Sequence, residues 1–124
     1  MHGLRGFTLI ELLVVLAIIS SLLTLAVPRY FRSIDTARET TLAENLRVSR
    51  ATIDKYYGDT GQYPESLDQL VEKNYLRALP VDPVTESTQT WVTVPPPAGG
   101  KGKVFNIRSG AQGNNRSGQP FSEM

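Results

Sequence analysis

A carboxylate lies inside the most apolar stretch of this 124-residue chain, where a charge needs a partner or water. Residues 7–27 contain 16 apolar residues among 21, and Glu11 is the one charged residue among them. A carboxylate costs roughly 2.5–3.5 kcal/mol at the centre of a membrane and less near its surface. Glu11 therefore either reaches up to the lipid headgroups or pairs with a cation from another chain. A new amine on Phe7 of a neighbouring chain would supply that cation, because Phe7 and Glu11 are about one helical turn apart.

The residues before this stretch indicate where such an amine would arise. Gly6 lies between Arg5 and Phe7, so a cut after Gly6 removes a short basic leader and keeps the apolar stretch whole. A removable secretory signal is the rival interpretation, but its apolar region has roughly 7–15 residues and its cleavage site follows that region. The stretch here would form a helix of about 31 Å, close to the roughly 30 Å of a bilayer core. We therefore expect a leader of residues 1–6 and a membrane helix of residues 7–28.

The composition excludes several kinds of chemistry. The chain has no cysteine, and its one histidine is His2, so thiolate, triad and zinc chemistry lose their central residues. The formal net charge of +1 gives no field for a nucleic acid. The spacing of the carboxylates does not indicate a shared cleft, which argues against an enzyme; these carboxylates include Asp54, Asp59, Asp68 and Asp82.

Beyond Pro28 the apolar residues continue at near-helical spacing, with charged residues between them. We expect one helix from about Phe7 to Tyr57, kinked at Pro28 and ended by a C-cap at Gly58. Such a stripe is too narrow to hold a helix in water alone, so a covering layer must follow. The stripe consists of Ile34, Leu42, Leu46, Ile53 and Tyr56.

The covering layer is predicted from turn signals and short apolar runs. Residues 66–69 have the Ser-x-x-Gln spacing of a capping box, which predicts a short helix beginning there. Residues 90–94 and 103–108 are expected to be strands, separated by a loop rich in proline and glycine. The fold class is therefore α+β: a long helix, membrane half and amphipathic half, packed on an αβ-loop and a small antiparallel sheet.

The run Gly-Phe-Thr-Leu-Ile-Glu-Leu at residues 6–12 resembles the prepilin peptidase signature of type IV pilins and type II secretion pseudopilins. The resemblance implies cleavage between Gly6 and Phe7, and Phe7 as the N-methylated mature terminus. It further implies that Glu11 recruits the subunit into a filament. A proline near Pro28 is frequent in the family, which assigns Pro28 to the same membrane and assembly segment. Residues 57–64, 75–83 and 104–111 are similar to those of the major pseudopilin.

The resemblance implies a structural function. Such a pseudopilin is polymerised from the bacterial inner membrane into a periplasmic filament that drives protein secretion. Its partners would be copies of itself, prepilin peptidase, the inner-membrane assembly platform, minor pseudopilins and the membrane. Residues 29–124 would form a periplasmic domain, although Arg29, Arg32 and Arg38 alone favour the cytoplasmic side by the positive-inside rule. Two alternatives stay open: a major or minor type IV pilin, and a non-assembling single-span anchor with a periplasmic binding domain.

The resemblance also implies calcium in the C-terminal loop, and the sequence departs from that pattern. Calcium prefers about six to eight oxygen ligands, normally including carboxylates. Residues 101–124 contain no aspartate and a single acid, Glu123. We therefore expect no bound cofactor and a C-terminal segment that is either held by packing of Phe121 or loose, with calcium as the weak alternative. Its candidate ligands are Asn106, Gln112, Asn114 and Ser117.

Overall fold

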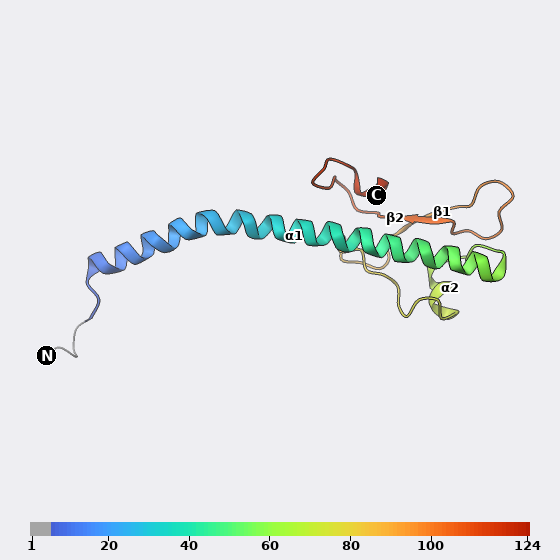
Figure 1. Ribbon diagram of the computed structural model, residues 1–124, viewed down its shortest axis with the longest axis horizontal. Coiled ribbons are helices and arrows are strands. Elements are labelled where there is room, and N and C mark those ends of the chain that lie inside the picture. The colour runs from blue at the N-terminus through green and yellow to red at the C-terminus, as the bar shows by residue number, and fades with distance from the viewer. Residues whose placement is uncertain (1–5) are drawn as a thin grey trace. The chain divides into compact units, whose positions relative to one another are not determined.

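The computed structural model describes residues 6–124, which fall into two compact units. The first unit ends at Asp35, and the second runs from Thr36 to Met124. Helix α1 contributes to both units, and all other elements belong to the second (Figure 1). The elements in chain order are α1 (Leu9–Thr60), α2 (Leu67–Glu72), β1 (Val92–Val94), β2 (Asn106–Arg108) and the 3-10 turn η2 (Phe121–Glu123).

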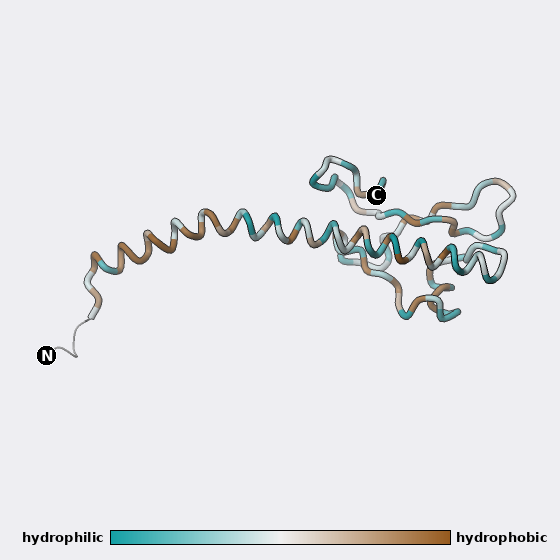
Figure 2. The backbone as a smooth tube through the Cα atoms, viewed as in Figure 1, coloured by the Kyte–Doolittle hydropathy of each residue, from teal (hydrophilic) through white to brown (hydrophobic). Residues whose placement is uncertain are grey.

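The first unit is the apolar part of α1, coloured brown in Figure 2. Its side chains have no protein cover: Phe7 is 88% exposed and Leu25 71% exposed. By length and composition, α1 contains one segment that could cross a membrane, with a mean hydropathy of 2.6 and none of it buried. Pro28 lies inside α1, so the prediction of a helix that continues past this proline is confirmed.

The predicted end of α1 was wrong by one turn. Gly58 lies inside the helix, and Gly61 is the residue that adopts the left-handed conformation, with φ of +74°. The N–H of Gly61 donates to the carbonyl of Tyr57 at 2.8 Å, which is the single bond of an αL cap. The Thr60 hydroxyl donates to the carbonyl of Tyr56 at 2.8 Å. Gly58 and Gly61 both lie near the end of the helix, and of these two only Gly61 has a positive φ.

The core of the second unit forms between the amphipathic part of α1 and the segments that follow it. Aromatic side chains close its edges, among them Tyr63, Tyr75, Trp91 and Phe121. The packing of Phe121 against this core confirms the expectation for the C-terminal segment. Ile34, the first residue of the predicted stripe, belongs to the other unit and is absent from the core. The buried hydrophobic residues that form this core cluster are Leu42, Leu46, Ile53, Tyr56, Leu67, Leu70, Val104 and Ile107.

Local hydrogen bonds explain the covering layer. The Ser66 hydroxyl accepts from the Gln69 N–H at 3.2 Å and caps α2, as predicted, while the Gln69 side chain accepts from the Glu65 N–H at 2.8 Å. β1 and β2 pair antiparallel, with Thr93 opposite Ile107. Both strands are shorter than predicted. The N–H groups of Lys103 and Val104 donate to Pro64 instead of to a strand partner, at 3.1 and 2.9 Å.

A fully buried carboxylate joins the two loops that flank the sheet. Asp82 is 0% exposed, and its Oδ1 accepts from the Val84 N–H at 2.9 Å. Its Oδ2 accepts from the Ser109 hydroxyl at 2.5 Å, and that hydroxyl accepts from the Ala111 N–H at 3.1 Å. Asp82 therefore links the loop before β1 to the loop after β2. These hydrogen bonds satisfy its buried carboxylate, which gives Asp82 a structural role.

Asp82→Ala should lower the free energy of unfolding by about 2–4 kcal/mol, because it leaves buried donors without an acceptor. The change is measured on the full chain in detergent micelles, using the emission of Trp91, the single tryptophan of the chain. Asp54→Ala is the matched control, since Asp54 is exposed on α1. Equal stability of the two variants would contradict the structural role of Asp82.

Candidate processing and assembly site

The candidate site begins where α1 begins, and its residues form a capping box. Gly6, Phe7 and Thr8 precede the helix, and Glu11 lies in its first turn. The Thr8 hydroxyl oxygen accepts from the Glu11 N–H at 3.1 Å, and Glu11 Oε2 accepts from the Thr8 N–H at 3.2 Å. The Leu12 N–H donates to the Thr8 carbonyl at 3.1 Å. Two backbone donors at the helix start are thus satisfied by a reciprocal pair of side chains.

This geometry assigns Glu11 a partner within its own chain. Neither sequence interpretation, headgroup contact or pairing with a neighbouring chain, included this hydrogen bond. The signal was present in the Thr-x-x-Glu spacing, and it marks Thr8 as a residue of the site that the sequence analysis missed. An acid in the first turn is also favoured by the partial positive charge of a helix N-terminus.

The expected cleavage position is open to an enzyme. Gly6 lies outside the helix with no neighbouring atom within 4 Å of where a Cβ would stand, and Phe7 is 88% exposed. The structure therefore brings Gly6, Phe7, Thr8 and Glu11 together at one helix end. The rest of the predicted leader, including His2 and Arg5, lies outside the described residues. Pro28 lies 17 residues beyond Glu11, about 26 Å along the helix, and is not part of this cluster.

The exposed helix that follows this end bonds two of its hydroxyl groups to its own backbone and has two apolar grooves. Two hydroxyl groups of the apolar stretch are bonded to the preceding turn, because Ser21 donates to the Ala17 carbonyl at 2.9 Å and Thr24 to the Ser20 carbonyl at 2.8 Å. This meets the requirement that polar groups in lipid be satisfied internally. The first groove has a volume of about 460 Å³, and its lining is Phe7, Ile10, Glu11, Val14 and Val15. The second has about 320 Å³, and its lining is Val14, Ala17, Ile18, Ser21 and Leu22.

The weak calcium candidates do not form a cation site. Asn106 Oδ1 accepts from the Arg50 side chain and from the Ile107 N–H, both at 2.8 Å, so it faces a guanidinium. The Ser117 hydroxyl donates to the Asn115 side chain at 2.7 Å, and Gln112 and Asn114 are exposed. Over residues 6–124, no three acids, histidines or cysteines gather as metal ligands would. The donors present do not fit the ion that the resemblance implies.

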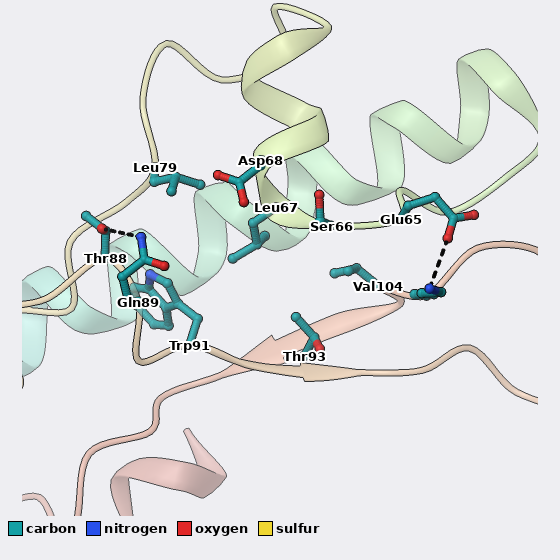
Figure 3. A pocket seen from close by; sticks show the side chains of 11 residues that line it. Glu65, Ser66, Leu67, Asp68, Leu79, Thr88, Gln89, Trp91, Thr93 and Val104 are labelled. Carbon is teal, nitrogen blue, oxygen red and sulfur yellow. Dashed lines mark hydrogen bonds and ion pairs between the residues drawn. The ribbon is translucent and has the colours of Figure 1, made fainter.

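A pocket in the second unit of about 260 Å³ lies between α2 and the sheet (Figure 3). Its charged side chains are Glu65, Asp68 and Lys103, and Lys103 lies 4.0 Å from Glu65. Ser66, on its wall, is used as the cap of α2. The Trp91 indole donates to the Pro80 carbonyl at 2.8 Å. The Ser66 hydroxyl and the Trp91 indole are therefore engaged in hydrogen bonds that hold the second unit together.

Comparison with known proteins supports the site at the N-terminus. The prokaryotic N-terminal methylation motif matches residues 1–27. The type II secretion system core protein G of Pseudomonas aeruginosa is 35% identical, over 63% of this chain and 66% of the relative. That of Klebsiella pneumoniae is 31% identical, over 67% and 71%. The competence protein ComGC of Halalkalibacterium halodurans is 31% identical, over 60% and 74%.

These matches extend the likeness beyond the membrane segment. The chain spans a little under two thirds of the length of the Pseudomonas relative. No solved structure matches the chain. The motif match lies on the residues that form the capping box and the exposed apolar helix, and the relatives also share part of the second unit. The chain therefore belongs to the family of the type II secretion system core protein G, the major pseudopilin family that residues 57–64, 75–83 and 104–111 resemble.

Proposed function

We propose that this chain is a structural subunit of a type II secretion pseudopilus and not an enzyme. The observation that supports this function best is a fully exposed apolar helix that begins with a capped Glu11, directly after the Gly6–Phe7 bond. The relatives named as core protein G support the same assignment. The helix would anchor the chain in the inner membrane, with the second unit in the periplasm.

Processing prepares the end of the helix for assembly. Prepilin peptidase would hydrolyse the Gly6–Phe7 bond, which leaves a free amine on Phe7 that then carries a methyl group. The exposure of both residues gives the peptidase access to this bond. The cut removes the leader and places a positive charge at the start of a helix whose first turn holds an acid.

Glu11 would act twice, within its own chain and between chains. A carboxylate has acceptor positions for several donors, so the hydrogen bond from Thr8 leaves room for a second partner. The ammonium of Phe7 on a neighbouring subunit would add that partner in an environment without water, where an ion pair is strong only if both charges are held in place. The capping box supplies this preorganisation because it fixes the carboxylate before the neighbour arrives.

Polymerisation would cover the apolar surface. Residues 7–27 expose their large side chains, and such a surface is stable in lipid or against other apolar helices. Copies of this chain would pack their helices into a filament core, with the second units on the outside. The assembly platform of the inner membrane and minor pseudopilins would direct this process, which needs no nucleic acid.

The competence protein ComGC supports a second candidate, a pilus of the type IV class. Both filaments would use the same cleavage, the same amine and the same glutamate. The greater identity of the Pseudomonas core protein G favours the secretion pseudopilus. A non-assembling membrane anchor would keep the helix and lose the requirement for Glu11.

Substitutions at the capping box separate its two uses. Glu11→Ala and Glu11→Gln should both insert into the membrane and both fail to enter filaments, since removing one partner of a desolvated ion pair costs about 3–5 kcal/mol. Glu11→Gln keeps an acceptor for the Thr8 N–H, so it tests the charge alone. Thr8→Val keeps the charge and costs only about 1 kcal/mol at the cap. It should therefore reduce filament yield without abolishing it.

Filament yield is measured by shearing and by electron microscopy in a secretion host, and membrane insertion by carbonate extraction. Glu44→Gln is the matched control, because Glu44 is an exposed glutamate on the same helix that pairs with Arg47. Normal filaments from Glu11→Gln as the only source of subunits would contradict the proposed ion pair. Normal filaments from Glu11→Ala as well would contradict the assembly function of the residue.

A further inference from the structure

The C-terminal segment of the second unit is held in place by positively charged side chains. Arg50, on α1, donates through Nε to Asn106 Oδ1 at 2.8 Å. Its Nη2 donates to the main-chain oxygen of Ile107 at 3.0 Å and to that of Met124 at 2.7 Å. One guanidinium thus gathers three oxygens from β2 and from the end of η2, segments that lie 56 to 74 residues away in the chain.

We propose that Arg50 is the internal cation of this fold and that the C-terminal segment, residues 109–124, is fastened by arginines in place of a divalent metal ion. A bound cation and this guanidinium do the same physical work, because each gathers oxygen atoms from distant segments. A guanidinium does it with donors of fixed direction and a charge that is never lost near neutral pH. This inference concerns the second unit and does not depend on the proposed function.

The side-chain oxygens of Asn106 and Asn115 already accept hydrogen bonds from donors of the protein. Asn106 Oδ1 accepts from Arg50 and from the Ile107 N–H. Asn115 Oδ1 accepts from the Ser117 N–H at 3.0 Å, the Ser117 hydroxyl at 2.7 Å and the Gln119 N–H at 3.0 Å. The loop is therefore closed by its own amide side chain. Residues 101–124 offer one carboxylate and four lysines or arginines, so the local charge also opposes a divalent cation.

A second arginine fastens the tip of the same loop. The guanidinium of Arg116 donates to the Thr36 hydroxyl, and the main-chain N–H of Arg116 donates to the Glu39 carboxylate. Both partners lie on α1, about three to four turns before Arg50. The segment after β2 is thus attached to one helix at two points, and both attachments are made by an arginine residue.

The environment of Arg50 agrees with an internal cation. Arg50 is half-buried, whereas Arg47, one turn earlier, is exposed and pairs with Glu44 at 2.6 Å. Burial, followed by the positive charge of Arg108, lowers the pKa of Arg50 from its usual value. Its ordinary value lies so far above neutrality that the charge persists.

The test measures hydrogen exchange of amides 106–124 in the full chain, in detergent micelles, with calcium chloride or with EDTA. The proposal predicts equal protection of the unmodified chain in both solutions. Arg50→Met should lower that protection by about tenfold or more in both, because it removes hydrogen bonds to a charged group. Arg47→Met is the matched control and should leave the protection unchanged, since exposed ion pairs contribute little.

Two results would overturn the proposal. One is a loss of protection of the unmodified chain in EDTA. The other is equal protection of amides 106–124 in Arg50→Met and in Arg47→Met. If the emission of Trp91 shows that Arg50→Met is unfolded altogether, Arg116→Ala replaces it. That variant should loosen residues 113–119 in both solutions, and restoration of their protection by calcium would contradict a metal-free attachment. Titration of the unmodified chain with calcium, followed by calorimetry, should show no binding heat.

Discussion

The exposed apolar surface of residues 7–27 is the constraint on which the rest of this molecule depends. Exposure of such an apolar surface to water is unfavourable, so the segment must lie in lipid or against other apolar helices. Either environment demands that polar groups find partners close by. The hydroxyls of Ser21 and Thr24 do so by bonding to the preceding turn, and Glu11 does so through the N–H of Thr8. The capping box thus gives this carboxylate one partner within its own chain.

The two parts of α1 meet opposite requirements with the same backbone. Its first part offers apolar side chains on all faces and has no cover. Its second part offers one narrow stripe, which is covered by α2, the sheet and the C-terminal segment to form a small core. That core is supplemented by directed polar contacts, of which the Asp82–Ser109 bond and the Arg50 cluster are the clearest. A small unit without disulfides depends on such contacts more than a large one does.

The sequence predicted the features that follow from local patterns. A long apolar run, helical periodicity and the Ser-x-x-Gln spacing were sufficient for α1, for the fold class and for the cap at Ser66. Features that depend on partners distant in the chain were not predicted. β2 is shorter than predicted because the N–H groups of Lys103 and Val104 donate to the Pro64 carbonyl. The attachment of Arg50 to Asn106 joins residues 56 positions apart, and no local pattern marks it.

If Glu11 pairs with an amine on Phe7 of a neighbouring chain, the Gly6–Phe7 bond must be cut. The most direct measurement is the intact mass of the protein recovered from membranes of a host that carries a prepilin peptidase. A matched host without the peptidase provides the reference mass. We expect a mass that lacks residues 1–6 and gains one methyl group in the first host only. An unchanged mass in both hosts would contradict this pairing, because Glu11 would then have no neighbouring amine to bind.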